Sequence, residues 1–350
     1  MYDAVLRVSE DKAMGMLIAI LLGFFGVLLM RRSLLWRQGG GDYVIDKMCA
    51  DNIQAAANCC ASCGTAEVDD VKLKKCDQCD LVRYCSVTCQ QEHQPQHEVM
   101  CKKRAAELRD EILFRQPEST HLGDCPICLL PLSPSTKDYL FETCCSKIIC
   151  RGCDIANKLL REREGQLRET CPFCRHPQPK TPEEQDKNIM KRAAANDSFA
   201  IRQMGMKCYR EGDYEGSFKY LSKAAELGDV GAHHFLGALY LEGKGVKKDY
   251  GKAFYCYEQA AIGGHPRARY NLGLDEGINE RYDRAVKHFI IAATLGNDDS
   301  IQRLKHCYTI GKVSKTDFAA ALRAHQAAVD AMKSPQREAA KEVNYPDGKW

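Results

Sequence analysis

The chain has 350 residues, of which 45% are hydrophobic and 28% charged, and its formal net charge is +3. This is the composition of an ordinary folded chain of two or three domains. It excludes a disordered tail, a collagen and a membrane protein with many spans, and the near-neutral charge gives no sign of a nucleic-acid binder. The unusual feature is the presence of twenty cysteines.

The first predicted element is an apolar helix over residues 13–30, which contain no charged side chain. At about 1.5 Å per residue, such a helix is long enough to cross a bilayer. Arg31 and Arg32 follow it in place of a small-residue cleavage site, so we expect one membrane anchor between a short tail (1–12) and a linker (31–59). A targeting peptide and a misassigned start of the reading frame are the alternatives. The positive-inside rule predicts a single-pass protein whose remaining modules face the cytosol, with the organelle left open.

Fifteen of the twenty cysteines lie between Cys60 and Cys174, mostly as Cys-x-x-Cys pairs. Secreted disulfide proteins also concentrate cysteine, but usually in chains of under about 100 residues with a signal peptide. Two thiolates at this spacing can bind one metal ion, and cytosolic cysteines stay reduced. The predicted cofactor is therefore Zn²⁺, with two ions in residues 60–101 and two in residues 125–174.

The first cysteine cluster, residues 60–101, contains four pairs of potential ligands in order, enough for two tetrahedral sites. The pairs are Cys60 and Cys63, Cys76 and Cys79, Cys85 and Cys89, and His97 and Cys101. The last two pairs are spaced i, i+4, which predicts that both ligands of each pair lie on one face of a helical turn. His93 remains an alternative to His97, and Cys59 to Cys60.

This order of pairs resembles the MYND zinc finger over the whole of residues 60–101. The resemblance implies interleaved sites, in which Cys60, Cys63, Cys85 and Cys89 bind one zinc and Cys76, Cys79, His97 and Cys101 bind the other. It also implies a docking surface for short proline-rich peptides. The family usually has Trp three residues before the histidine, where this chain has Gln94. The peptide groove therefore lacks this aromatic side chain, and a finger that is only a scaffold is the alternative.

A helical linker (102–121) is expected before the second cysteine cluster, which we place in residues 122–180. Its sulfurs are those of Cys125 and Cys128, Cys144 and Cys145, Cys150 and Cys153, and Cys171 and Cys174. The pattern resembles an all-cysteine RING finger. The resemblance implies that Cys125, Cys128, Cys150 and Cys153 bind one zinc and that Cys144, Cys145, Cys171 and Cys174 bind the other. Lys147 stands where RING fingers usually have histidine, and His176 is an alternative to Cys144 because adjacent ligands are sterically awkward.

A RING finger holds a ubiquitin-conjugating enzyme that is charged with ubiquitin. By this resemblance, an apolar docking platform is expected at Ile127, Ile155, Pro172 and Phe173. Arg175 follows the last ligand and is the candidate for orienting the thioester, since a planar guanidinium suits a two-sided contact. The alternative is that Arg175 is a solvated surface residue and that Pro172 and Phe173 only pack the knuckle. No catalytic nucleophile is expected, so an enzyme here would be a RING-type E3 ubiquitin-protein transferase that forms no covalent intermediate.

After a linker (181–195), an internal repeat fills residues 196–310. Its Met-Gly or Leu-Gly step recurs at Gly205, Gly237 and Gly273, and Ala-Ala recurs at the same two intervals in the opposite order. Periods of this size are typical of solenoids of paired helices. The pattern resembles the SEL-one-like repeat, which implies a protein-binding surface.

Beyond the repeats we expect a capping helix over residues 311–335, with Thr316 or Asp317 as its N-cap, and a flexible tail over residues 336–350. The predicted fold class is mainly α: an N-terminal transmembrane helix, two small zinc-stapled modules and a helical-repeat solenoid. The predicted function is a membrane-tethered RING-type ubiquitin ligase, with substrate recruited by the MYND finger or the repeats. The alternative is a non-enzymatic adaptor. Neither cluster has a recognition helix rich in Arg or Lys, which disfavours nucleic acid as a partner.

Overall fold

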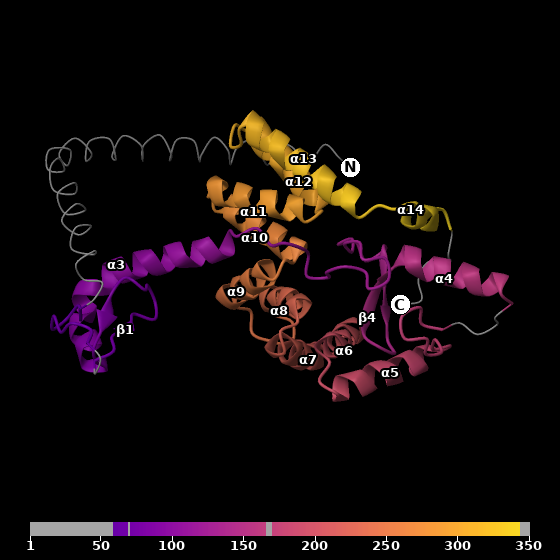
Figure 1. Cartoon of the computed structure of the whole chain (residues 1–350), viewed down its shortest axis with the longest axis horizontal. Coiled ribbons are helices and arrows are strands. Elements are labelled where there is room, and N and C mark those ends of the chain that lie inside the picture. The colour runs from indigo at the N-terminus through magenta and orange to yellow at the C-terminus, as the bar shows by residue number, and fades with distance from the viewer. Residues whose placement is uncertain (1–58, 69–70, 166–169, 344–350) are drawn as a thin grey trace, which may run out of the picture. The chain divides into compact units, whose positions relative to one another are not determined.

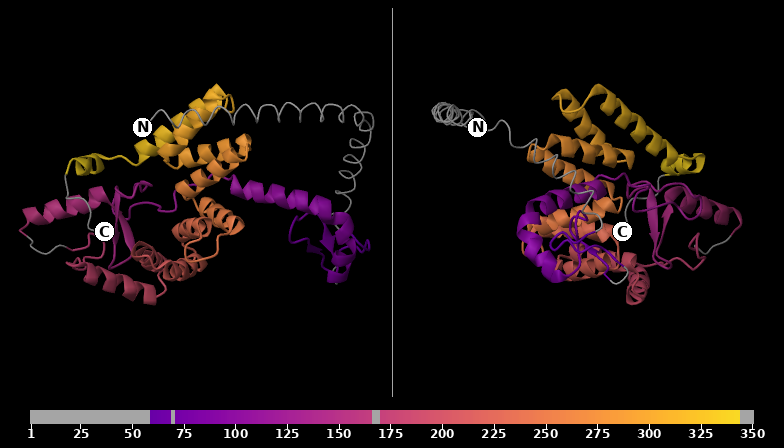
Figure 2. Two further views of the ribbon diagram at one scale, coloured as in Figure 1. Left: turned by 180° about the vertical axis from the view of Figure 1, so that it is seen from behind. Right: turned by 60° about the vertical axis from the view of Figure 1, so that its left-hand side comes forward.

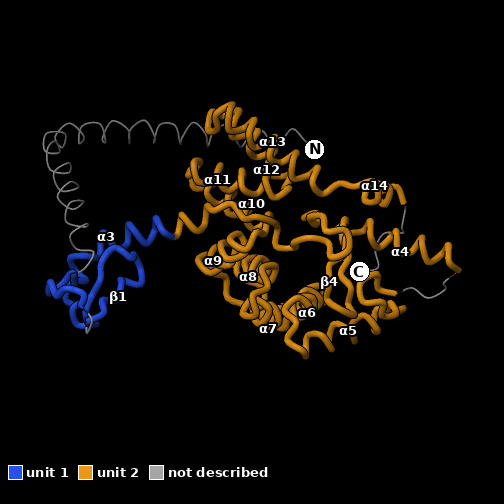
Figure 3. The backbone as a smooth tube through the Cα atoms, in the orientation of Figure 1, with its two compact units in different colours: residues 1–108 blue, residues 109–350 orange. Residues whose placement is uncertain are grey.

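The computed structural model describes residues 59–68, 71–165 and 170–343. The chain divides into two compact units, Met1–Leu108 and Arg109–Trp350, which Figure 3 shows in different colours. Helices make up most of the described residues, so the expectation of a mainly helical chain with cysteine-rich modules and a repeat solenoid is confirmed.

Most elements of the described residues are labelled in Figure 1. In chain order the elements are β1 (Lys74–Lys75), β2 (Arg83–Tyr84), α3 (Val87–Leu113), β3 (Tyr139–Glu142), β4 (Lys147–Cys150), α4 (Arg151–Arg163), α5 (Pro182–Ala194), α6 (Ser198–Glu211), α7 (Tyr214–Glu226), α8 (Val230–Glu242), α9 (Tyr250–Ile262), α10 (Pro266–Ile278), α11 (Tyr282–Thr294), α12 (Asp298–Thr309), α13 (Lys315–Ala331) and α14 (Pro335–Glu342).

One part of the predicted fold class is corrected. Among the residues that the structure describes, no helix combines the length and the apolar character needed to cross a membrane. The expected span, residues 13–30, lies outside the described residues. The transmembrane helix is therefore removed from the fold class, and the single-pass membrane location that depended on it is withdrawn.

The first unit contains a small cysteine-rich module built on the antiparallel pair β1–β2, in which Lys74 lies opposite Tyr84. Its buried side chains are mostly cysteines, together with Leu73 and Tyr84. So few apolar residues cannot stabilise a fold alone, and small domains of this kind usually need metal ions or disulfides.

The second cysteine module is built on a longer antiparallel pair, β3–β4, whose register places Tyr139 opposite Cys150. Helix α4 begins directly after β4. Cys150 is its N-cap, and the Cys150 sulfur accepts a hydrogen bond from the backbone N–H of Cys153. Ile149 and Leu132 are fully buried beneath the cysteines.

The repeats consist of three helix pairs, α6–α7, α8–α9 and α10–α11, each packed on the next (Figures 1 and 2). The glycine of each repeated step lies in the first helix of its pair and faces a bulky side chain of the second. These contacts are Gly205 with Leu221, Gly237 with Tyr257, and Gly273 with Phe289. A Cβ atom added at Gly237 would lie 2.6 Å from Cε1 of Tyr257. The glycines therefore set how closely the paired helices approach.

Helix α13 packs against α11 and α12 at the end of the repeats, where we expected a capping helix. Its N-cap is Ser314, whose hydroxyl accepts the backbone N–H of Asp317 at 3.0 Å. The predicted caps, Thr316 and Asp317, are therefore wrong, because the helix begins at Lys315.

The second cysteine module packs against helices from both ends of the repeat segment. On one side the ring of Phe141 lies 4.5 Å from that of Phe199 in α6, and Asn188 of α5 donates to the Thr143 hydroxyl. On the other side α14 packs on α4. Helix α5 occupies the expected linker at residues 181–195, and most of α14 falls in the expected tail.

Residues 109–121 lie along the repeats. Arg269 of α10 is fully buried and donates to the carbonyl oxygens of Leu113 and Ala261. The ring of Phe114 lies 4.7 Å from that of His288 in α11. The end of α3 and the segment after it are therefore part of the core of the second unit.

Three half-buried histidines stack where this segment meets the repeats. The ring of His265 lies 4.2 Å from that of His121 and 4.3 Å from that of His234. Burial, with Arg202 and His234 nearby, lowers the pKa of His121 to about 3, and burial with Arg267 and Arg202 nearby lowers that of His234 to about 4. Burial also holds the pKa of His265 well below its usual value. The stack is therefore neutral at physiological pH.

The Gly237 contact can be tested by a substitution. We expect Gly237→Ala to destabilise the chain by about 1–3 kcal/mol, because its methyl group would overlap the Tyr257 ring. Gly251→Ala, in α9, is the control: its added Cβ would meet only Asp249 Oδ1, at 3.4 Å. Since alanine favours helix, that variant should be as stable as the parent or more so. Equal thermal midpoints for both variants would contradict the close approach.

The histidine stack predicts a loss of stability in acid. A histidine whose pKa is lowered on folding contributes stability above its unfolded pKa of about 6.5, which is lost as the pH falls toward the folded value. For His234 that window runs from 6.5 to about 4. We expect His234→Phe to reduce the slope of unfolding free energy against pH there by up to about 1.4 kcal/mol per pH unit. The parent and His234→Phe share the acid sensitivity of the cysteine modules, so that contribution cancels in the comparison. Identical slopes of unfolding free energy against pH would show that His234 takes up no proton on unfolding.

Candidate metal centres

Four groups of side chains bring their ligand atoms together in the described residues. Within each group these atoms all lie within 4.8 Å of one another. The groups are Cys60, Cys63, Cys85 and Cys89; Cys76, Cys79, His97 and Cys101; Cys125, Cys128, Cys150 and Cys153; and Cys144, Cys145, Cys171 and Cys174. Each group joins the first and third, or the second and fourth, pair of its module. This is the interleaved arrangement that the two resemblances implied.

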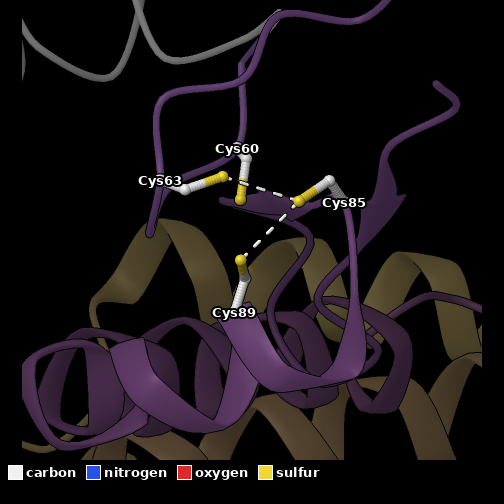
Figure 4. Close-up of side chains that lie close together, drawn as sticks. All are labelled: Cys60, Cys63, Cys85 and Cys89. Atoms are coloured by element: carbon white, nitrogen blue, oxygen red, sulfur yellow. Dashed lines mark hydrogen bonds between the residues drawn. The ribbon is translucent and has the colours of Figure 1, made fainter.

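The spacing of the sulfurs suits tetrahedral zinc. A Zn–S bond of about 2.3 Å places the sulfurs of a regular tetrahedron about 3.8 Å apart. In the first group, Cys85 Sγ lies 3.5 Å from Cys63 Sγ and 3.6 Å from Cys89 Sγ, and all four side chains point toward one centre (Figure 4). In the third group, Cys128 Sγ and Cys150 Sγ are 3.7 Å apart.

Four Cys-x-x-Cys pairs, two in each module, share one backbone turn. The residue after each pair has a left-handed conformation, and its N–H donates to the carbonyl oxygen of the first cysteine at 2.9 or 3.0 Å. These residues are Gly64 (φ 74°), Asp80 (φ 58°), Leu129 (φ 57°) and Arg175 (φ 60°). The turn directs both sulfurs of a pair to the same point, and it occurs in both modules.

The remaining ligands are positioned by helices and by one strand turn. Cys89, His97 and Cys101 lie in α3, whereas Cys85 precedes the helix, so the expected helical turn for the Cys85–Cys89 pair is not formed. Cys144 and Cys145 lie in the turn between β3 and β4. Their adjacency does not separate them, since Cys144 Sγ lies 3.3 Å from Cys174 Sγ and Cys145 Sγ lies 3.8 Å from Cys171 Sγ.

The alternative ligands lie outside these groups. His93 Nδ1 is 3.1 Å from the hydroxyl oxygen of Tyr84, and its ring stacks on that of His97. His97 instead places Nε2 3.1 Å from Cys79 Sγ. Burial lowers the pKa of His97, which keeps the imidazole neutral and able to act as a ligand. Neither Cys59 nor His176 belongs to any of the four groups.

The electrostatics of the sulfur groups indicate a need for a cation. A hydrogen bond with the Cys150 side chain, opposed by burial and assisted by backbone N–H groups, lowers the pKa of Cys125 to about 4. Within the same group, burial and the nearby thiolate charge of Cys125 raise the pKa of Cys153 to about 12. One thiolate forms readily, but four cannot coexist without a positive charge between them. Thiolate-rich sites of this geometry are those that Zn²⁺ prefers.

The candidate docking residues of the second module differ in exposure. Ile127 and Phe173 are exposed, at 41% and 44%, and Arg175 is exposed beside them in sequence. Pro172 is half-buried. Ile155 is only 4% exposed, so it belongs to the interior and contributes nothing to a surface platform.

A cleft of about 200 Å³ lies beside the second sulfur group of the first module. Gln94, at the position where MYND fingers usually have Trp, lines it together with Tyr84, Gln90, Glu98 and Lys102. Most of these side chains are polar or charged, and Gln94 does not supply the aromatic surface that the usual Trp would offer to a proline.

Comparison with known families identifies two of the three modules. Residues 60–101 match the MYND finger, and residues 198–229, 230–265 and 266–297 match three Sel1 repeats. The chain thus carries a MYND zinc finger followed by Sel1 repeats, both of them protein-interaction modules. Neither match covers the second cysteine module.

Similar solved structures include a Sel1 repeat protein. The chain is 30% identical to the Sel1 repeat protein from Oxalobacter formigenes, covering 43% of this chain and 66% of that one, just under two thirds, with a TM-score of 0.38. It is 28% identical to Helicobacter pylori cysteine rich protein B (35% and 97% covered, TM-score 0.30). It is 22% identical to c5321, a protective antigen of uropathogenic Escherichia coli (49% and 38% covered, TM-score 0.36). With TM-scores below 0.5, none of these similarities bears on function. No curated protein matches the chain.

The prediction of Zn²⁺ as the cofactor is confirmed by the MYND match and by the cysteine-rich groups, which suit zinc. The assignment of individual ligands stays a prediction. Zinc would be held by the four groups, and its chemistry there would be structural, since each group supplies four protein ligands and leaves no position open for substrate.

The ligand assignment can be tested by counting metal. We expect the full chain to bind four zinc ions, measured by mass spectrometry of the metal after gel filtration. Cys171→Ser should lower this by about one ion, because serine is a poor zinc ligand. Cys59→Ser, which changes the residue next to Cys60, should leave the count unchanged. A loss of zinc in the Cys59 variant, or only two ions in the parent, would overturn the assignment.

Proposed function

We propose that this protein-interaction scaffold acts as a RING-type ubiquitin ligase, in which the second cysteine module positions a charged ubiquitin-conjugating enzyme. The observation that carries the proposal is the interleaving of two four-sulfur groups over residues 125–174, with one Cys-Pro-x-Cys turn at each end of the module. Both turns expose an apolar side chain, Ile127 in one and Phe173 in the other.

Arg175 would orient the thioester. Its backbone is fixed by the turn, since its N–H donates to the Cys171 carbonyl at 2.9 Å, while its side chain is exposed. Its planar guanidinium can donate hydrogen bonds on two sides, and the fixed backbone limits where that group can lie. Both properties suit a residue that must contact two proteins at once. The ligase would act by holding another enzyme's thioester in a reactive pose, and no residue of this chain would form a covalent intermediate.

Substrate would be recruited by the MYND finger or by the repeats. The polar cleft beside Gln94 favours a peptide with hydrogen-bonding side chains over a proline-rich one. On the repeats, residues 109–121 already cover part of α9, α10 and α11. A substrate would therefore bind the remaining repeat surface.

A non-enzymatic adaptor is the second candidate. The burial of Ile155 favours it, because the exposed apolar platform is then reduced to Ile127, Phe173 and half-buried Pro172. The adaptor would keep the same zinc ions and the same protein partners, and it would differ only in lacking a conjugating enzyme.

A ubiquitin-discharge assay separates the two candidates. The full chain, loaded with zinc, is mixed with a panel of ubiquitin-charged conjugating enzymes, and loss of the thioester is followed in the presence of free lysine. We expect discharge by the parent, reduced roughly tenfold or more in Arg175→Ala, because the thioester would no longer be held in its reactive orientation. Ile127→Ala should also reduce it by weakening docking.

Arg163→Ala is the matched control, since Arg163 is another exposed arginine of the same module, near the end of α4. It should leave discharge unchanged. Equal discharge with and without the zinc-loaded protein, across the whole panel, would reject the ligase in favour of the adaptor. Discharge that is insensitive to Arg175 would reject its orienting role.

A further inference from the structure

The C-terminal helix α14 packs directly on α4 of the second cysteine module, as Figure 1 shows. Gln336 donates to the carbonyl oxygen of Gly152 at 3.0 Å, and Ala340 is 2% exposed. Gly152 has no side chain, and a Cβ atom there would lie 3.0 Å from both Cα and Cγ of Arg337. The absence of a side chain at residue 152 allows Arg337 to lie against the start of α4.

Arg337 reaches a predicted zinc ligand from this position. One terminal nitrogen, Nη2, lies 3.3 Å from Cys128 Sγ and donates to the Leu130 carbonyl at 3.0 Å. The other, Nη1, donates to the carbonyl oxygens of Pro131 and Met332 at 2.6 and 2.8 Å. The guanidinium is thus held by three carbonyls with one N–H directed at the sulfur. Its backbone is also fixed, since the Arg337 N–H donates to the N-cap Ser334.

The negative charge expected at the four-cysteine site explains how the contact between Arg337 and Cys128 can stabilise it. Four thiolates around one Zn²⁺ carry a net charge of −2, and hydrogen bonds to ligand atoms from neighbouring groups strengthen metal sites. A guanidinium is always protonated and presents several donors in one plane. It can therefore hold the surrounding carbonyls and a thiolate together, which a lysine ammonium would do less well.

We propose that Arg337 stabilises the zinc bound by Cys125, Cys128, Cys150 and Cys153, and that α14 is thereby a working part of the second cysteine module although 209 residues separate the two partners. Loss of α14 or of the guanidinium frees zinc from this group and leaves the MYND finger unaffected. The inference rests on the proposed ligand assignment for these four cysteines.

The test follows individual cysteines in the full, zinc-loaded chain. The protein is challenged with excess EDTA, samples are taken over time into N-ethylmaleimide, and peptide mass mapping reports how fast each cysteine becomes labelled. In Arg337→Gln we expect Cys125, Cys128, Cys150 and Cys153 to be labelled roughly tenfold faster than in the parent, at the lower end of what removing such a partner costs a metal site. The MYND cysteines serve as an internal reference and should not change.

Gln336→Ala is the matched control, because it removes a separate hydrogen bond of α14 to this module, to the Gly152 carbonyl, without touching a sulfur. Labelling at parental rates in Arg337→Gln, or equal acceleration in Gln336→Ala, would overturn the role of the guanidinium. If Arg337→Gln loses helical circular dichroism, Arg337→Lys is measured in its place, because it keeps the positive charge. Its labelling rate should lie between those of the parent and of Arg337→Gln. Labelling of Arg337→Lys at the parental rate would overturn the proposal. Immediate labelling of these cysteines in the parent would instead show that the ligand assignment is wrong.

Discussion

The confinement of four sulfur or nitrogen ligands around each of four points is the constraint on which both small modules depend. Their interiors consist largely of the cysteines themselves, with a few apolar residues such as Leu73 in the first module and Ile149 in the second. Without a cation, burial and mutual repulsion disfavour the thiolates, as the raised pKa of Cys153 indicates. With zinc, the same sulfurs become the strongest links between segments far apart in sequence. The metal therefore takes the place of a hydrophobic core.

The interleaved pairing makes each module cooperative. Each group takes one pair of ligands from each half of its module. Unfolding of one half would therefore remove ligands from both groups, so the two halves are expected to fold and unfold together. In the second module this frame is also fastened from outside, by α5 and α6 through Asn188 and Phe199, and by α14 through Arg337. The module and the repeats consequently belong to one compact unit, and we expect them to lose their structure together.

The candidate ligand pairs could be predicted from spacing, because ligand spacing is a local property of the chain, whereas the sharing of a site by two distant pairs was an expectation from the family resemblances. The glycines of the repeats could also be recognised in the sequence, because they recur at regular intervals. In the structure each of them faces one bulky side chain of the next helix. What the sequence could not predict depends on long-range packing. Three features are of this kind: the burial of Ile155, the covering of α9 to α11 by residues 109–121, and the contact of Arg337 with Cys128. Each depends on segments that share no recognisable sequence pattern. One local signal was missed: the left-handed residue that follows four of the Cys-x-x-Cys pairs, which only Gly64 makes visible in the sequence.

The placement of the second module has a consequence for either proposed function. A partner bound at Ile127 or Phe173 would be held on the same compact unit as the repeats. Its orientation toward anything bound by the repeats would therefore be set by packing and not by a linker. That geometry suits a ligase, in which a thioester must meet a substrate lysine in a defined orientation. It suits an adaptor equally well if two partners must be held side by side. The distinction between them then lies in whether the exposed side chain of Arg175 orients a thioester, because the scaffold that would present it is common to both.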